Sequence, residues 1–272
     1  MKESSILFIS AGLKQAKKDG NPFARFHSYL NYGLLGLASI LYRKGYSTKV
    51  YHGRLYNPKC FSDFVMNHSN FVPDYPLFLS LPSVFAIEWA KEFIDNFKLH
   101  FPLTKIIVGG RWVVENDGKW IRSVLPKIDL VVYGTAEKRI ESLLNPLTWN
   151  SIDYTDISRY QVSESQNLEY PTYDYELMYD YKEFHPSIEV SRGCGLGCSF
   201  CLEKETPLQK IKSTQDILDE IKDIQSIYQT ENVTPYFESS FFRPSSNWAK
   251  QLSNEYINGN YSFKWRSETR ID

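Results

Sequence analysis

The stretch Val190-Ser191-Arg192-Gly193-Cys194-Gly195-Leu196-Gly197-Cys198-Ser199-Phe200-Cys201 holds three of the four cysteines of this 272-residue chain. Three residues separate the first two cysteines, and two separate the second from the third. Three glycines lie in the same loop, and glycine lets a short backbone segment turn tightly. Three thiolates this close in sequence can converge on one inorganic centre.

The number of ligands narrows the kind of centre. A structural zinc site uses four protein ligands, and no cysteine or histidine follows Cys201. A four-iron cluster held by Cys194, Cys198 and Cys201 would keep one iron open to a substrate or cosubstrate, as a catalytic centre requires. A zinc knuckle that takes His185 as fourth ligand and a set of buried cysteines without a metal are the alternatives. Disulfides are disfavoured, because three clustered cysteines and the distant Cys60 do not form a stapling pattern.

This loop resembles the signature of the radical S-adenosylmethionine (radical SAM) superfamily. The resemblance rests on the cysteine spacing, on Phe200 directly before the last cysteine, and on Ser191-Arg192-Gly193 directly before the first. It implies a [4Fe-4S] cluster on Cys194, Cys198 and Cys201, with the open iron chelated by the amino and carboxylate groups of SAM and with Phe200 near the cofactor. It also implies reductive cleavage of SAM to methionine and a 5'-deoxyadenosyl radical.

Composition bounds the class of protein. The 31 basic and 32 acidic side chains give a net charge of -1, which indicates neither a nucleic-acid nor a membrane-surface partner. Hydrophobic residues make up 42% of the chain, enough for sizeable cores. No apolar run approaches the roughly 20 residues of a spanning helix, and the N-terminus has no signal-peptide pattern. We therefore expect a cytoplasmic, reducing environment, which also suits an oxygen-sensitive cluster.

Short apolar runs alternate with helical patterns through the first half of the chain. The expected strands are 6–9, 47–51, 77–81, 105–108 and 130–133, and the expected helices are 30–44, 84–97, 120–125 and 137–144. This alternation predicts a parallel sheet with helices on both faces. We expect a flavodoxin-like, doubly wound α/β domain over residues 1–145.

Glycine turns follow the fourth and fifth expected strands, as Gly109-Gly110 and Gly134-Thr135-Ala136-Glu137. Ligands of parallel sheets bind at the carboxyl ends of strands, but such glycines are also common in plain tight turns. Together with the cysteine loop, Ile106 to Gly110 and Val131 to Glu137 resemble the cobalamin-binding domain that precedes the barrel in one radical SAM subgroup. The resemblance implies that Gly109, Gly110 and Gly134 contact cobalamin. The Asp-x-His-x-x-Gly element that supplies an axial histidine in other cobalamin proteins is absent, so a domain without a corrinoid is an alternative.

Residues 146–186 show no clean period and are rich in tyrosine. Within them, Tyr170-Pro171-Thr172-Tyr173-Asp174-Tyr175 resembles the linker of the same subgroup. A stacking platform for nucleic acid would need more accompanying basic residues than the two, Arg159 and Lys182, that this segment holds. The sequence favours a linker that lays its rings across two domains.

The second half restarts the alternation of strands and helices. The expected strands are 187–191, 233–237 and 261–266, and the expected helices are 213–228 and 244–256, the second opened by Pro244. The first of these strands delivers the cysteine loop at its carboxyl end, where barrel enzymes carry their chemistry. The radical SAM resemblance implies that Glu238 and Ser239 contact the amino group or ribose of SAM and that Arg270 contacts its carboxylate. A loop cap for Glu238 and a surface ion pair for Arg270 are the alternatives.

Residues 187–272 hold only three strand-and-helix units, whereas a complete eight-unit barrel takes about 250 residues. We therefore expect the first part of a (β/α) partial TIM barrel at 187–272, truncated, after a tyrosine-rich linker at 146–186. The chain would be a fragment, or a member that borrows the rest of the barrel from a partner.

The function expected from this resemblance is that of a radical SAM enzyme. It would perform cobalamin-dependent methyl transfer, or another modification of a peptide or small natural-product substrate, with electrons from a reductant such as flavodoxin or ferredoxin. The alternative is a non-catalytic corrinoid-binding or accessory protein with an incomplete radical SAM core. A methylthiotransferase is disfavoured, because that class places further cluster cysteines in its first domain and only Cys60 is present there.

Overall fold

The computed structural model describes residues 5–14, 30–54, 56–68, 74–110, 112–113, 118–151, 170–199 and 207–269. They divide into two compact units. The first holds the described residues up to 151, except 30–32, together with Tyr173–Tyr181. The second holds residues 30–32 and 170–172 and the described part of Lys182–Asp272.

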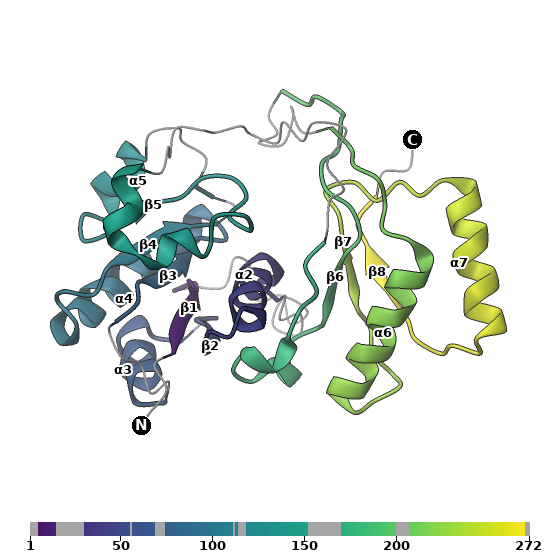
Figure 1. Ribbon diagram of the computed structural model, residues 1–272, viewed down its shortest axis with the longest axis horizontal. Coiled ribbons are helices and arrows are strands. Elements are labelled where there is room, and N and C mark those ends of the chain that lie inside the picture. Colours follow the sequence, from purple (N-terminus) through teal and green to yellow (C-terminus); the bar gives the residue numbers. More distant parts are fainter. Residues whose placement is uncertain are drawn as a thin grey trace. The chain divides into compact units, whose positions relative to one another are not determined.

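Five parallel strands form the sheet of the first unit (Figure 1). They are β1 (Ile6–Ser10), β2 (Thr48–His52), β3 (Leu77–Ser80), β4 (Ile106–Gly109) and β5 (Leu130–Val131). Their order, β2-β1-β3-β4-β5, is that of a flavodoxin-like fold, in which ligands bind beyond the carboxyl ends of β1 and β3. The predicted parallel α/β sheet is therefore confirmed.

The two faces of this sheet follow from the alternation of side chains along each strand. Leu7 and Ile9 belong to one buried cluster that also includes side chains of α3 (Pro58–His68), α4 (Ile87–His100) and α5 (Lys119–Val124). Phe8 and Phe78 point to the other face, where their rings stack 4.7 Å apart. Helix α2 (Tyr32–Arg43) lies on the opposite side of the strands from α3 and α4 (Figure 1).

Helix α4 packs through a ladder of aromatic rings. Trp89, Phe93 and Phe97 recur every fourth residue, are fully buried, and stack at centroid distances of 5.3 and 6.0 Å. The indole Nε1–H of Trp89 donates to the carbonyl oxygen of Tyr56 at 2.7 Å. A β-carbon at Gly53 would lie 2.5 Å from the Trp89 ring, so the ring occupies the space that a side chain at position 53 would need. Each buried ring of this kind contributes about 1.5–3 kcal/mol through burial of apolar area.

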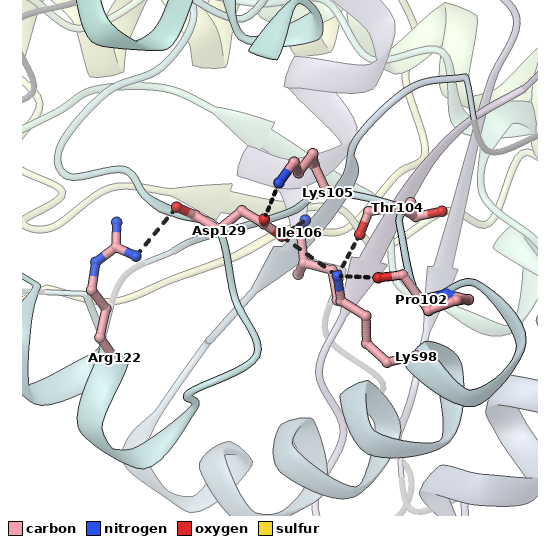
Figure 2. A network of polar contacts seen from close by, with 7 residues as sticks. All are labelled: Lys98, Pro102, Thr104, Lys105, Ile106, Arg122 and Asp129. Atoms are coloured by element: carbon pink, nitrogen blue, oxygen red, sulfur yellow. Dashed lines mark hydrogen bonds and ion pairs between the residues drawn. The ribbon is translucent and has the colours of Figure 1, made fainter. Parts of the chain in front are cut away.

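Asp129 ties the amino ends of β4 and β5 together (Figure 2). Its Oδ2 accepts the backbone N–H of Ile106 at 2.9 Å, and its Oδ1 accepts from Lys105 Nζ at 2.8 Å. Lys98 Nζ lies 3.6 Å from Oδ2, and the Arg122 guanidinium donates to the Asp129 carbonyl at 3.2 Å. This network lies at the amino edge of the sheet, away from the edge where such folds bind ligands, which indicates a role in stability.

The second unit repeats a strand and a helix around a three-stranded parallel sheet, ordered β6-β7-β8 (Figure 1). The strands are β6 (Ser187–Glu189), β7 (Tyr236–Glu238) and β8 (Arg266–Ser267), and the helices are α6 (Thr214–Tyr228) and α7 (Ser246–Asn258). Ser213 and Ser245 cap the two helices, each accepting the N–H group three residues on. In the described part of the chain, no helix combines the length and hydropathy that crossing a membrane requires.

Short 3-10 helices complete the fold: η1 (Val84–Ala86), η2 (Ser142–Leu144), η3 (Pro146–Ser151), η4 (Tyr175–Leu177) and η5 (Tyr181–Glu183). The prediction of a helix at 137–144 is wrong. Within this range the structure has only the 3-10 turn η2, at Ser142–Leu144. Arg139 instead donates to the carbonyl oxygens of Tyr133 and Thr135, at 3.1 and 3.0 Å, which holds the chain in a turn after β5.

Two further expectations in the second unit need correction. The strand expected at 261–266 is reduced to the two residues of β8, because the Phe263 ring packs on Tyr256 at 5.1 Å and its carbonyl accepts from the Tyr256 hydroxyl at 2.9 Å. Pro244 does not open α7 as expected, since it precedes the capping residue Ser245.

Candidate functional site

The cysteine loop leaves the second sheet at the carboxyl end of β6. Beyond that strand, Val190 N–H donates to the carbonyl oxygen of Glu238 at 2.9 Å, which extends the pairing with β7. The carbonyl oxygens of Val190 and Arg192 accept from the N–H groups of Lys212 and Gln209, at 2.8 and 2.9 Å. The segment before α6 thus pairs with the start of the loop on the side away from β7, and backbone bonds on both sides fix its position.

Three glycines of the loop have a left-handed backbone. Their φ angles are +72° at Gly193, +70° at Gly195 and +66° at Gly197, whereas Cys194 and Leu196 between them have no positive φ. Side chains rarely adopt this conformation, so glycine is required at these positions. Where the residues between such glycines are right-handed helical, a run of this kind turns successive N–H groups inward and binds anions, as at many iron-sulfur sites.

Two of the three cysteines of this loop lie among the described residues. Cys194 and Cys198 are half-buried, and neither forms a disulfide. Cys201 and Phe200 lie outside the described residues. Across the described ranges, no three His, Cys, Asp or Glu side chains gather as metal ligands do, so His185 does not join these two cysteines and the zinc alternative gains no support. The described donors are the thiols of Cys194 and Cys198, in a loop with three left-handed glycines, and Cys201 follows in sequence.

Buried charges flank the start of the loop. Arg192 and Glu189 form an ion pair whose side chains are 16% and 6% exposed, with Nε to Oε1 at 2.6 Å. Lys212 pairs with Glu220, and its ammonium lies 5.3 Å from the centre of the Tyr170 ring. Burial raises the pKa of Tyr170 to about 12; the charge of Glu189 adds to the rise, and Arg192 opposes it. Burial also raises the pKa of the Glu220 carboxyl, against the pull of Lys212.

The residues predicted to contact SAM lie beside this loop where they are described. Glu238 ends β7, and its Oε1 accepts from the Ser187 hydroxyl at 2.8 Å. The hydroxyl oxygens of Ser239 and Ser191 lie 2.6 Å apart and share a hydrogen bond. Arg270 lies outside the described residues. The structure thus brings the ends of β6 and β7 together, with polar groups from both strands.

The three glycines predicted to contact cobalamin differ in what surrounds them. A β-carbon on Gly110, which has φ +108°, would lie 2.6 Å from Ser80 Oγ and 2.7 Å from the nitrogen of Leu81. Packing alone therefore requires Gly110. A β-carbon on Gly109 would meet its nearest atom at an ordinary 3.4 Å, and one on Gly134, with φ +64°, would meet nothing within 4 Å. Of the three, Gly134 leaves the most open space for a ligand at the carboxyl end of β5.

His52 ends β2 at the same edge of the first sheet. Its Nδ1 accepts the backbone N–H of Arg54 at 3.0 Å, so the hydrogen of the neutral ring is on Nε2. Burial, with the charge of Arg54 as a second cause, lowers the pKa of His52 to about 4. A histidine that binds a metal through Nε2 carries its hydrogen on Nδ1. This arrangement does not present His52 as an axial cobalt ligand, in keeping with the missing Asp-x-His-x-x-Gly element.

Glu189 and Gln209 were not predicted from the sequence as neighbours of the loop, and neither was the contact between Ser191 and Ser239. A signal existed for Glu189, because it is the one charged residue of an otherwise uncharged strand and lies three residues before Arg192. Gln209 and the contact between Ser191 and Ser239 had no such signal, since they depend on how distant segments pair.

Neither a family model nor a curated protein matches this chain. Among solved structures, that of the apo, selenomethionine-labelled, cobalamin-dependent S-adenosylmethionine radical enzyme OxsB matches with a TM-score of 0.62. The chain shares a fold with OxsB. The match covers 99% of this chain at 15% sequence identity. It covers 39% of the OxsB chain, so this chain spans well under half the length of OxsB.

Proposed function

We propose that this chain is part of a radical SAM protein of the cobalamin-dependent kind. The observation that carries the proposal is the cysteine loop itself, which follows the first strand of a β/α unit and turns at three left-handed glycines. The shared fold with OxsB, over nearly the whole of this chain, supports the same interpretation.

In this proposal, Cys194, Cys198 and Cys201 bind three irons of a [4Fe-4S] cluster, and the fourth iron stays open for SAM. When bound, such a cluster supplies the electron that splits SAM into methionine and a 5'-deoxyadenosyl radical, which abstracts a hydrogen atom from the substrate. The loop N–H groups stabilise the negative charge of the thiolates and sulfides. The paired segment before α6 keeps the loop in place.

The carboxyl ends of β6 and β7 supply the polar contacts to SAM. Glu238 is assigned to the SAM ammonium group, because its carboxylate lies at the carboxyl end of β7 and a carboxylate accepts several hydrogen bonds. Ser239 is assigned to the ribose, Arg270 to the carboxylate, and Phe200 to the neighbourhood of the cofactor. Arg192 is assigned no contact to SAM, because Glu189 already binds its guanidinium through two hydrogen bonds.

The first unit is proposed to bind cobalamin at the carboxyl edge of its sheet, near Gly134 and Gly109. Methyl transfer to a peptide or small natural-product substrate is the reaction that such a pair of cofactors supports. A flavodoxin or ferredoxin is the proposed source of electrons. Gly110 lies at the same edge, and its contacts with Ser80 and Leu81 already account for the glycine there.

Anaerobic reconstitution of the chain with iron and sulfide tests the cluster. The wild type should retain about four irons per chain, and dithionite with SAM should yield 5'-deoxyadenosine. Cys198→Ala should lose most of the iron and all of the product. Cys60→Ala is the matched control, because Cys60 is an exposed cysteine on α3 of the first unit. Equal iron in the Cys198→Ala and wild-type proteins would overturn the proposal.

Titration with hydroxocobalamin tests the first unit separately. Gly134→Val should weaken corrinoid binding, because the side chain enters the open space at the carboxyl edge. Gly45→Val is the control, since Gly45 also has a positive φ (+92°) and open space around it but precedes β2 at the amino edge. Corrinoid binding by a wild type that assembles no cluster would favour the accessory-protein alternative.

A further inference from the structure

Gln209 carries a buried side-chain amide with both polar atoms unsatisfied. Its Nε2 and Oε1 are inaccessible to solvent, and neither has a hydrogen-bond partner in the part of the chain that the structure describes. A buried amide without a partner costs its full desolvation free energy, so folded proteins rarely keep one unless another group completes it.

The backbone of Gln209 places this amide beside the cysteine loop. Its N–H donates to the carbonyl oxygen of Arg192 at 2.9 Å. The preceding residue, Leu208, has its nitrogen 3.4 Å from where a β-carbon on Gly195 would lie. These two contacts bracket Cys194, which lies between Arg192 and Gly195 in the loop. The backbone of Gln209 therefore lies next to the part of the loop that carries Cys194.

We infer that the Gln209 amide donates a hydrogen bond to a sulfur atom of the cluster, either the Cys194 thiolate or an inorganic sulfide. This inference rests on the proposed function. Sulfur atoms of a cluster are negative acceptors, and they are the groups that the loop would bring within reach of this amide. Either end of the amide can be turned toward them, since a 180° rotation exchanges nitrogen and oxygen.

A donor in this position has a consequence for the redox chemistry. Reduction adds an electron to the cluster, and hydrogen bonds to its sulfurs stabilise the more negative state. Gln209 therefore raises the reduction potential and helps retain the cluster. It acts on the cluster and not on the substrate, so it is a tuning residue.

The variant Gln209→Leu separates a role in binding the cluster from a purely structural role. The two roles predict opposite changes in the resistance of the iron-free protein to urea. Without the cluster, the variant loses an unsatisfied amide and should be at least as resistant to urea as the wild type. After reconstitution, its cluster should have a more negative midpoint potential, and its iron affinity should fall by about tenfold, as on loss of other groups that contact metal ligands.

Thr214→Val is the matched control. Thr214 is a buried residue of the same segment whose Oγ1 also lacks a partner among the described residues, but it begins α6. This variant should leave the potential and the iron content unchanged. Loss of urea resistance in iron-free Gln209→Leu, or an unchanged potential after reconstitution, would overturn the inference. Failure of the wild type to take up iron would instead overturn the proposed function on which it rests.

Discussion

The Arg192 guanidinium donates two hydrogen bonds to the carboxylate of Glu189, Nε to Oε1 at 2.6 Å and Nη2 to Oε2 at 2.8 Å. Glu189 is the last residue of β6, and Arg192 directly precedes the first left-handed glycine of the cysteine loop. The two-pronged geometry fixes the direction of the guanidinium plane as well as its distance. The pair therefore links the end of the strand to the start of the loop.

Glu189→Gln should destabilise the second unit by about 3 kcal/mol, because it leaves the Arg192 guanidinium buried without its counter-charge. Urea unfolding, followed by tryptophan fluorescence, measures the loss. Asp219→Asn removes a pair with Lys222 in which both side chains are 55% exposed, and it should leave the unfolding midpoint unchanged. A Glu189→Gln midpoint equal to that of the wild type would mean that the pair contributes nothing.

His52 should make the first unit sensitive to acid. Its folded-state pKa, about 4, is lower than the ordinary 6.5, so between these values the unfolded chain binds a proton that the folded chain does not. Stability should be unaffected above about pH 7 and should fall as the pH drops from 6.5 toward 4, by at most about 3 kcal/mol. Denaturant unfolding at a series of pH values measures this.

His52→Asn keeps an acceptor for the Arg54 N–H but cannot titrate in this range. Its unfolding free energy should depend less on pH than that of the wild type between 6.5 and 4. Identical pH profiles would show that other groups cause the acid sensitivity.

Gly110→Ala should be more destabilising than Gly134→Ala. At Gly134 the cost is that of a left-handed backbone, about 1–2 kcal/mol, because nothing lies within 4 Å of the new carbon. At Gly110 the new carbon would also meet Ser80 Oγ at 2.6 Å and the Leu81 nitrogen at 2.7 Å, so β3 would have to move. Thermal unfolding of the two variants compares them, and equal midpoints would contradict the packing role of Gly110.

Asp129→Asn should destabilise the first unit by about 2 kcal/mol, because an amide replaces the charged acceptor of the Ile106 N–H and of two lysines. Asp95→Asn is the control, since the pair of Asp95 with Lys127 has side chains 47% and 51% exposed. Denaturant unfolding should separate the two variants clearly. A small effect at position 129 would mean that the backbone pairing alone holds β4 and β5.

The strands of the first sheet could be predicted from the sequence because they are continuous apolar runs, as in the fully buried Ile6 to Ile9. Helix α3 was not predicted, although Asn57 accepts the N–H groups of Lys59 and Cys60 and Pro58 opens the first turn. Phe61, Phe64 and Val65 fall at helical spacing, so the sequence did carry a signal for this helix. The helix expected at 84–97 begins as the 3-10 turn η1, in which Phe85 is 64% exposed, and α4 starts only at Ile87.

Some features of the candidate site could likewise be predicted from the sequence, and others could not. Cysteine spacing is a local feature, so the sequence alone makes Cys194 and Cys198 candidate ligands, and the turns at the glycines between them agree with the structure. The contact between Ser191 and Ser239 joins residues 48 positions apart and depends on the register of two strands. The sequence pattern gives the existence of such strands but not their register to one residue. Gln209 escaped prediction for the same reason.

The fit between Gly53 and the Trp89 ring constrains how this protein can evolve. A side chain at position 53 would require both a smaller residue at position 89 and a shift of the Gly12 backbone, whose nitrogen would lie 2.7 Å from the new carbon. A smaller residue at position 89 would first open a cavity in the core, so the intermediate would be disfavoured. Homologues that share this fold should therefore keep glycine at position 53, even where the residue at position 89 differs.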